Sequence, residues 1–423
     1  MENNRRVDKQ ADSLQSSKGG SFLASLFKRA IIKKFKSLKV GYIRLDDGSE
    51  SHSFGDPDSN IKTSVTIISD EFYLLLGSRG LLGVAEAYST GYWKADDLVK
   101  LIQIVVQNKE VMGQLESGWS KIFKPINALI HLRRKNSLSG SKKNILAHYD
   151  LSNDFYRLWL DDTMTYSCAF FKDSSTSLED ASIEKLDRIC RKLKLCSDDS
   201  VLEIGTGWGS FAIHAASKYG CKVTSTTISD AQYNYAVSKV RDANLSDKIS
   251  ILKEDYRQLS GKYDKIVSIE MIEAVGHEYV PIYFKKVSEL LKDDGFFALQ
   301  GITYNDQGFD VYKHNVDFIK KYIFPGSCLI SISQVVDSMK QYTDLSIAHL
   351  EDITMHYAKT LRIWRDNFLA QTESVKGLGF SQEFINMWEF YFVYCEAGFR
   401  ERHIGDFQFI FSKPNSKKIK IEY

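Results

Sequence analysis

Hydrophobic positions in the first part of the chain recur with the spacing of a helix. Within residues 21–38, apolar side chains return about every 3.6 positions, and Lys or Arg occupies most positions between them. The apolar set is Phe22, Leu23, Leu26, Phe27, Ala30, Ile31, Phe35 and Leu38. This pattern predicts a basic amphipathic helix, which either lies on an anionic lipid surface or packs its apolar stripe against its own domain. The polar residues 1–20 predict a disordered tail.

The next segment mixes the periods of strands and helices. Alternation typical of strands runs from 39 to 76, whereas 80–110 has the spacing of helices. The combination predicts a small α+β domain at 36–115. Residues 133–143 are charged, Ser-rich and without core positions, which is typical of a linker. We therefore divide the chain into an arm (1–35), a small domain (36–115), a linker (116–143) and a large domain (144–423).

Strand-like and helix-like segments alternate in the large domain. Apolar runs predict strands at 198–205, 222–228, 249–253, 263–269 and 295–302. Helices are predicted between some of them, at 210–219 and 230–243. This alternation predicts an α/β fold with a doubly wound, mainly parallel sheet. Because ligands of such sheets bind at the carboxyl ends of the strands, we expect functional residues to follow the predicted strands.

Composition and charge narrow the classes of function. Hydrophobic residues make up 43% of the chain and charged residues 26%, which excludes a wholly disordered or fibrous protein. The net charge is +2, so no overall bias points to a nucleic acid partner. The first forty residues hold ten Lys or Arg against three Asp or Glu, a net charge of +7, and the remaining chain therefore carries −5. The arm is basic and the body is mildly acidic.

Cysteine usage and the apolar segments indicate the compartment. The six cysteines form no C-x-x-C pair and are few for this length, so neither a disulfide framework nor a metal site is expected. The N-terminus lacks the apolar core of a secretory signal. No window approaches the roughly 18 uninterrupted apolar residues of a membrane-spanning helix. We expect a soluble, cytoplasmic protein.

A glycine-rich turn follows the first predicted strand of the large domain. Residues 201–209 have the form E-x-G-x-G-x-G, in which Glu203 precedes Gly205, Gly207 and Gly209. Glycine lets the backbone turn sharply and approach a ligand, and the N-terminus of the following helix adds a positive dipole. The spacing differs from the dinucleotide pattern G-x-G-x-x-G, and a tight strand–helix connection without a ligand is the alternative. In this context the turn resembles the S-adenosylmethionine turn of class I methyltransferases.

That resemblance assigns further residues to the cofactor. The second strand ends at Thr226–Ser229 without an acid to hold the ribose hydroxyls, and Gln232 is the substitute. Asp255 and Tyr256 follow the third strand, where they are placed to bound the adenine. The expected cofactor-binding set is Tyr166, Ser167, Glu203, Gly205, Gly207, Gly209, Thr227, Ser229, Gln232, Asp255 and Tyr256.

Longer motifs make the resemblance specific. Six segments, in order, resemble the cyclopropane-fatty-acyl-phospholipid synthase family: 148–156, 163–171, 268–276, 318–326, 357–364 and 394–402. In addition, 83–93 resembles the N-terminal lipid-binding domain of the longer members. The resemblance implies a class I methyltransferase fold, with a Rossmann-like doubly wound sheet. It also implies a reaction, in which a methylene group from S-adenosylmethionine is added across a cis double bond of a phospholipid acyl chain to form a cyclopropane ring.

The family's base is a bound bicarbonate ion that removes a proton from the new methyl group. Carried over by motif, its ligands here are Cys168, Glu273, Gln300, the backbone of Ile302, and Tyr357. Bacterial members commonly present His where this chain has Gln300. A Gln amide donates a hydrogen bond to a carbonate oxygen, but it cannot relay a proton as an imidazole does.

Each of these residues could also be explained by a purely structural role. Cys168 lies in an aromatic stretch and is compatible with a small buried hydrophobe, and Tyr357 is compatible with a core position. Glu270 and Glu273 are spaced i, i+3, as on a solvated helix face. Cys395 lies in a motif that resembles the segment said to contain an active-site cysteine, although the chemistry requires no covalent thiol.

The implied partners follow from the substrate. We expect a phospholipid bilayer surface, no nucleic acid and, as one option, a second copy of the chain in a homodimer. The enzyme is then cytoplasmic and peripherally associated with the inner face of the membrane. Two alternative activities are a methyltransferase that gives a methyl-branched lipid and one that methylates a soluble amine. The non-enzyme alternative is an inactive lipid-binding protein.

Overall fold

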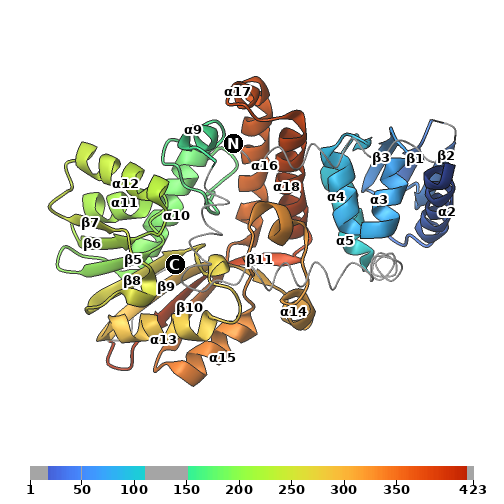
Figure 1. The fold of residues 1–423 in the computed structure, drawn as a ribbon. Helices are drawn as coiled ribbons and strands as arrows, with labels where there is room; N and C mark the ends of the chain where they lie inside the picture. Colours follow the sequence, from blue (N-terminus) through green and yellow to red (C-terminus); the bar gives the residue numbers. More distant parts are fainter. Residues whose placement is uncertain (1–17, 49, 110–150, 417–423) are drawn as a thin grey trace. The chain divides into compact units, whose positions relative to one another are not determined.

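The computed structural model describes residues 18–48, 50–109 and 151–416 (Figure 1). The chain divides into two compact units, Met1–Pro125 with Ser381–Phe390, and Ile126–Phe380 with Tyr391–Tyr423. The expected tail before residue 18 and the expected linker at 116–143 lie outside the described residues. Within the described ranges, no helix combines the length and apolarity that crossing a bilayer requires.

The first unit is built on a four-stranded sheet in the order β2–β1–β3–β4. Strand β1 is antiparallel to β2 and parallel to β3, and β3 is antiparallel to β4. The strands are β1 (Tyr42–Asp46), β2 (Ser51–Gly55), β3 (Lys62–Ile67) and β4 (Trp93–Ala95). The helices are α2 (Lys18–Phe35), α3 (Glu71–Arg79), α4 (Leu81–Ser89) and α5 (Leu98–Gln107). The predicted α+β character is present.

Two boundaries in this unit differ from the prediction. Helix α3 occupies part of the strand-like stretch, and β4 interrupts the stretch predicted as helical. The reason is that Gly91, with a φ of 77°, follows the end of α4, after which Trp93 pairs with Ile67 in the sheet and buries its ring. Residues Ser381–Phe390, far away in the sequence, also belong to this unit. Tyr88 of α4 donates a hydrogen bond from its hydroxyl to Glu389 at 2.8 Å.

Helix α2 packs on the small domain instead of standing apart as an arm. Ala24 and Ile31 are buried, and the ring of Phe35 meets Phe54 of β2 edge-on with the ring centroids 5.4 Å apart. The ring of Phe27 lies so close to Gly77 of α3 that a Cβ there would overlap it. The arm and the small domain are therefore one packed unit in the described residues.

The second unit contains a seven-stranded sheet in the order β10–β11–β9–β8–β5–β6–β7. Within the group β5 to β9, every pair of adjacent strands is parallel. Strand β11 is antiparallel to both β9 and β10. The strands are β5 (Ser200–Ile204), β6 (Lys222–Thr226), β7 (Ile249–Leu252), β8 (Tyr263–Ile269), β9 (Leu291–Tyr304), β10 (Ser346–Asp352) and β11 (Ile404–Ser412). The chain leaves β5 toward β6 and β7 and returns to β8 on the other side, so β5 lies at the switch point of the sheet.

Helices cover both faces of this sheet (Figure 1). The α-helices are α9 (Asn153–Arg157), α10 (Leu178–Leu193), α11 (Ser210–Tyr219), α12 (Asp230–Asp242), α13 (Val280–Leu290), α14 (Asp306–Tyr312), α15 (Ile332–Tyr342), α16 (Thr354–Ala370), α17 (Thr372–Gly377) and α18 (Gln382–Arg400). Short helical turns are η1 (Tyr256–Gln258), η2 (Ile272–Ala274) and η3 (Ile319–Ile323). Helix α18 begins in the first unit and ends in the second.

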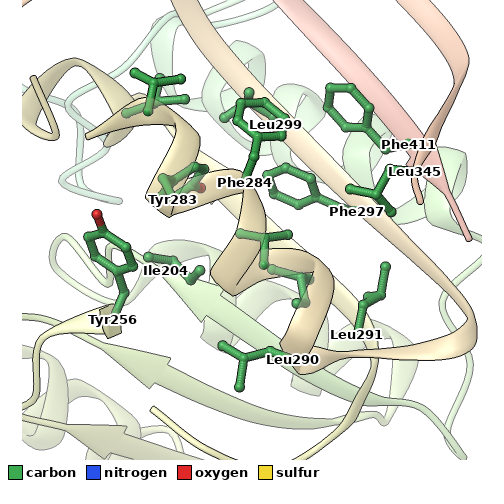
Figure 2. Packing of buried hydrophobic residues seen from close by; sticks show 14 of the residues in the cluster. Ile204, Tyr256, Tyr283, Phe284, Leu290, Leu291, Phe297, Leu299, Leu345 and Phe411 are labelled. Atoms are coloured by element: carbon green, nitrogen blue, oxygen red, sulfur yellow. The ribbon is translucent and has the colours of Figure 1, made fainter. Parts of the chain in front are cut away.

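Two hydrophobic cores lie on the opposite faces of the sheet. In β9, Phe297 and Leu299 belong to one core and Phe296 and Ala298 to the other, because successive side chains of a strand point to opposite faces. The first core packs under α13 and α15, and Figure 2 shows Phe284 of α13 among its members. The second packs under α10 and α11. Burial on both faces explains why the central strands appear in the sequence as near-continuous apolar runs.

Candidate active site

The glycine turn connects β5 to α11. Gly205, Gly207 and Gly209 have φ angles of 102°, 54° and 93°, in the region that residues with a Cβ rarely adopt. A Cβ on Gly207 would meet no atom within 4 Å, so the backbone borders open space there. A Cβ on Gly205 would lie 3.0 Å from the side chain of Met271. The turn is a backbone surface that a ligand can approach, at the N-terminus of a helix.

Glu203 supports this turn from within the sheet. Its side chain is buried, and its Oε2 accepts a hydrogen bond from Ser225 Oγ at 2.5 Å. Ser225 Oγ also lies 2.7 Å from Thr206 Oγ1 in the turn. Burial raises the pKa of Glu203 to about 8, so the carboxyl group is largely protonated at neutral pH. The contacts of Glu203 position the turn.

The expected ribose-binding residues form a compact turn after β6. Thr227 Oγ1 donates to Gln232 Oε1 at 2.9 Å and accepts from the backbone N–H of Ser229 at 3.1 Å. Ser229 caps α12, because its side chain accepts from the backbone N–H of Gln232 at 3.3 Å. All three residues are buried. The structure therefore brings them together, with the amide oxygen of Gln232 already paired.

Asp255 and Tyr256 have structural contacts of their own. The carboxylate of Asp255 accepts two hydrogen bonds from the Arg257 guanidinium, at 2.8 and 2.6 Å. Tyr256 is buried in the first core, where its ring meets Tyr283 edge-on with the centroids 5.3 Å apart (Figure 2). Tyr256 is thus packed in the core, and its expected place beside the adenine stays a prediction.

A carboxylate lies at the centre of the second group of expected residues. Glu270 follows the last residue of β8, and its Oε1 accepts from the backbone N–H of Cys168 and from Gln300 Nε2, both at 2.8 Å. Its Oε2 accepts from the hydroxyl of Tyr357 on α16 at 2.6 Å. Cys168, Gln300 and Tyr357 come from three distant parts of the chain, and the fold directs all three to this carboxyl group.

A second carboxyl group lies beside the first. Glu273, in η2, accepts from the backbone N–H of Ile302 at 2.5 Å through Oε1. Burial, and then the nearby charge of Glu270, raise the pKa of Glu273 to about 8. Neither Glu270 nor Glu273 lies on a solvated helix face, because β8 ends at Ile269 and only a single helical turn follows. That alternative is wrong.

A network of buried polar side chains contacts this group of carboxyl residues. Gln300 Nε2 also donates to Asp406 at 3.2 Å, and Gln408 Nε2 donates to Gln300 Oε1 at 2.9 Å. Asp406 and Gln408 are neighbours of β9 in the sheet, with Gln408 directly opposite Gln300. Burial and the charge of Glu270 raise the pKa of Asp406 well above its usual range. The network fixes the amide of Gln300 so that its N–H points to Glu270.

The positive charge nearest to these carboxyl groups is itself buried. Lys185 of α10 is 0% exposed, and its Nζ donates to Ser167 Oγ at 2.6 Å. Burial lowers the pKa of Lys185, while Glu270 acts in the opposite direction. Ser167 was expected to touch the cofactor; the structure gives it this lysine as a partner. Lys185 and Glu270 therefore compensate each other's charge in a desolvated region.

Tyr166 and Cys395 complete the expected set. The hydroxyl of Tyr166 lies 2.8 Å from that of Tyr391, and its ring packs edge-on against Trp159 and Trp364. Burial raises the pKa of the Cys395 thiol well above its usual range. It raises the pKa of the Cys168 thiol in the same way. Protonated thiols are poor nucleophiles, so neither cysteine is prepared for covalent chemistry. Cys168 contributes its backbone N–H.

The contacts of this group do not fit the bicarbonate ion that the resemblance implies. The expected donors are the backbone N–H groups of Cys168 and Ile302, the Gln300 amide and the Tyr357 hydroxyl. The structure pairs every one of them with a carboxyl oxygen of Glu270 or Glu273. The donors expected for the ion are therefore already paired within the protein.

The sequence interpretation missed Lys185, Asp406 and Gln408 and gave Glu270 no role. For Lys185 a signal was present, because Ala181, Lys185 and Ile189 are spaced by four and all three are buried on one face of α10. Asp406 and Gln408 offered none, since their strand was not predicted.

Known proteins resemble this chain over most of its length. The family model for mycolic acid cyclopropane synthetase matches residues 136–409. The chain is 36% identical over 341 residues to tuberculostearic acid methyltransferase UfaA1 of Mycobacterium tuberculosis, covering 79% of each chain. It is 34% identical over 352 residues to the cyclopropane-fatty-acyl-phospholipid synthase of Escherichia coli, covering 82% of this chain and 87% of that protein.

A solved structure shares the architecture of the second unit. The mycolic acid cyclopropane synthase CmaA1, complexed with SAH and CTAB, has a TM-score of 0.60 to this chain at 32% sequence identity. The match covers 64% of this chain and 98% of that one.

Proposed function

Because the chain belongs to the mycolic acid cyclopropane synthetase family, we propose that it adds a methylene group from S-adenosylmethionine across a cis double bond of a phospholipid acyl chain, forming a cyclopropane ring. The class I methyltransferase fold predicted from the sequence is confirmed. The observation that carries the proposal is a carboxyl group held by three donors, one residue before Met271, whose side chain would lie 3.0 Å from a Cβ on Gly205 of the glycine turn.

The residues of the turn fit S-adenosylmethionine. The open space above Gly207 allows the methionine portion to approach the backbone, as a side chain there would not. Thr227 and Ser229 hold Gln232 in place for the ribose, where its amide group is the polar partner. Bound S-adenosylmethionine supplies an electrophilic methyl group. The Met271 side chain lies where a Cβ on Gly205 would point, which places the neighbouring Glu270 near that end of the proposed cofactor site.

The surrounding aromatic residues serve a reaction that must exclude water. Tyr357 packs edge-on against Trp364, which in turn packs against Tyr166, so aromatic side chains continue from the carboxylate to the expected cofactor residue. Phe399 stacks on Tyr357 with a centroid distance of 4.4 Å. Attack of the alkene on the methyl group leaves a positive charge on the lipid, which water would quench. Aromatic faces keep water away and attract a cation.

For the substrate, we propose a phospholipid bilayer reached through α2 and the small domain, with the enzyme attached peripherally to the cytoplasmic face. Phe22, Leu23 and Leu26 remain 72%, 46% and 50% exposed although α2 packs on its own unit. Lys28 is paired with Asp47 and Glu50 at 2.5 and 3.2 Å, whereas Arg29, Lys33 and Lys36 are exposed. Exposed apolar and basic residues on one helix are typical of attachment to anionic lipid. A homodimer on the bilayer stays a prediction.

The membrane proposal is tested with an exposed-residue variant, because removing the whole helix would also remove packing. Replacing Phe22, Leu23 and Leu26 with Ser should reduce sedimentation with anionic phospholipid vesicles. The matched control is Ile68→Ser, which also removes an exposed apolar side chain from this unit. Equal sedimentation of both variants and the unaltered protein would remove α2 from the mechanism.

A methyl-branched product is the second candidate, favoured by the 36% identity to a protein named tuberculostearic acid methyltransferase. One experiment separates the products. The protein is expressed in a host that lacks such an enzyme, the cells are fed methionine with a fully deuterated methyl group, and total fatty acids are analysed by mass spectrometry. A ring retains the methyl carbon with one deuterium lost and leaves no double bond. A branch formed by the same methyl transfer keeps a double bond, because the carbocation must lose a proton and no reductant is supplied, so the olefinic signal separates the two products. Methylation of amines alone, or of nothing, would contradict both lipid activities.

A further inference from the structure

Glu270 is held in an unusual backbone conformation. Its φ angle is 48°, in the left-handed region, where a residue with a Cβ costs roughly 1 kcal/mol. Its backbone N–H donates to Gln300 O at 2.9 Å, so it remains tied to β9 after β8 has ended. Strain of this kind persists where the surrounding structure requires it, and it is concentrated at functional sites. Here its effect is to turn the side chain toward Cys168, Gln300 and Tyr357.

The three donors to Glu270 match the needs of an ionised carboxylate. Two of its hydrogen bonds are made to Oε1 and one to Oε2, so Oε2 retains a lone pair for a proton. Hydrogen bonds to the charged form favour ionisation, as does the buried Lys185. Burial acts more strongly in the other direction and raises the pKa of the carboxyl group, which makes it a better base. Glu270 also keeps partial exposure, so it is not sealed from a substrate.

The neighbouring acids have other partners. Burial and the charge of Glu270 raise the pKa of Asp406, and its carboxyl group accepts from Gln300 Nε2. Glu273 is largely protonated at neutral pH and accepts from the backbone of Ile302. Of the three acids, Glu270 is the one whose carboxyl group accepts three hydrogen bonds. Both bicarbonate and a glutamate side chain present the same O–C–O⁻ unit to their donors.

We propose that Glu270 is the general base of this enzyme, in the place of a bicarbonate ion. The inference rests on the proposed function. As the alkene attacks, a C–C bond forms to the methyl carbon and its bond to sulfur breaks, leaving a carbocation on the adjacent carbon of the lipid. Glu270 Oε2 takes a proton from the new methyl group, and the released C–H electron pair closes the third side of the ring. The neutral Glu270 then returns the proton to solvent.

A tethered base changes what the enzyme requires from its surroundings. A carboxylate that is part of the chain is present at every turnover, whereas bicarbonate must bind from solution and be retained. The enzyme should therefore be indifferent to dissolved carbonate. The Gln300 amide is suited to this arrangement, because it orients a fixed carboxylate and has no need to carry a proton away.

The decisive variant is Glu270→Gly, which removes the carboxylate, opens its space and suits a φ of 48°. Turnover on unsaturated phospholipid vesicles should fall about 100- to 10,000-fold, the usual contribution of a general base, while cofactor affinity in calorimetry is retained. Added bicarbonate should restore part of the activity of this variant only. Glu270→Gln retains the size of the side chain but not its basicity, and it should be as inactive without being rescued. Glu289→Gln, an exposed glutamate on α13, is the control.

Binding of bicarbonate gives an independent result. Isotope-labelled bicarbonate followed by NMR should bind to Glu270→Gly and not to the unaltered protein, whether or not the lipid reaction has been identified correctly. If the unaltered enzyme binds bicarbonate, or loses activity in carbonate-free buffer and recovers when it is added, Glu270 is not the base. Full activity of Glu270→Gly in carbonate-free buffer would overturn the inference equally. Absence of any lipid product with normal binding results would contradict the proposed function alone.

Discussion

The glycine turn and the carboxylate group around Glu270 lie in the same sheet but are built in opposite ways. The turn is a continuous segment, and its chemistry comes from the backbone: three glycines with positive φ at the switch point of the sheet. The carboxylate group is assembled from a backbone N–H of a loop and from side chains of three strand regions and α16, which are brought together only by the completed fold. A continuous site is visible in the sequence, whereas an assembled one requires the structure.

The two regions also differ in what they can tolerate. At the turn the essential property is the absence of a side chain, so any Cβ is harmful. In the carboxylate group, each contact is one of several that converge on a single acid. Cofactor affinity should therefore depend on the turn, and turnover on the carboxylate group. The following variants test this separation.

The largest effect is expected at the turn. Gly207→Val should reduce affinity for S-adenosylmethionine by at least ~100-fold, or about 2.8 kcal/mol, because the side chain would occupy the space that the ligand needs. Calorimetry measures the affinity, and circular dichroism should show an unaltered fold, since no protein atom lies near the added Cβ. Unchanged affinity would mean that the turn is only a strand–helix connection. Gly379→Val, at a glycine that also has a positive φ, of 94°, and would meet no atom within 4 Å, is the control for substitution at an open glycine.

A large effect on stability is expected at Lys185. Lys185→Met removes the buried positive charge that favours ionisation of Glu270, and removal of one partner of a buried pair costs roughly 3–5 kcal/mol. Urea unfolding near neutral pH should show this loss, and it should become smaller in acid, where the carboxyl groups are protonated in both variants. The control is Lys285→Met on an exposed position of α13. Equal stability of the two variants would mean that Lys185 does not stabilise the protein through the carboxylate group.

The sequence predicted the region of the glycine turn better than the carboxylate group. The parallel strands β5 to β9 and the turn were predicted, because burial on both faces gives apolar runs and glycine marks sharp turns. The two strands of the antiparallel edge were not predicted. Strand β10 consists of exposed and half-buried residues, and β11 carries Asp406 and Gln408 within an apolar segment. The resemblance supplied Cys168, Gln300 and Tyr357, but not their convergence on Glu270. That contact depends on a left-handed residue after β8, which no local pattern marks.

A moderate, pH-dependent effect on stability is expected for two acids, Glu203 at the turn and Glu273 in the carboxylate group. Burial raises the pKa of both Glu203 and Glu273 to about 8, from an ordinary value of 4.5. Between these values the unfolded chain releases the proton and the folded protein keeps it, so stability falls as pH rises through this range. Glu203→Gln and Glu273→Gln should each reduce this decline in urea titrations of the cofactor-free protein. In activity they should differ, since the first weakens cofactor binding and the second slows turnover.

The smallest effect is expected where the assembled group has the most redundancy. Gln300 donates to Glu270 and to Asp406 and accepts from Gln408, while Cys168 and Tyr357 hold the same carboxylate independently. Gln300→His keeps one N–H for Glu270 and loses the bond from Gln408. Since a single hydrogen bond contributes about 1 kcal/mol, turnover should fall only several-fold, at constant cofactor affinity. Steady-state kinetics on vesicles measures the change, and the variant should stay insensitive to bicarbonate. A complete loss of turnover would show instead that the amide is indispensable to the position of Glu270, and that the assembled site is as intolerant of substitution as the turn.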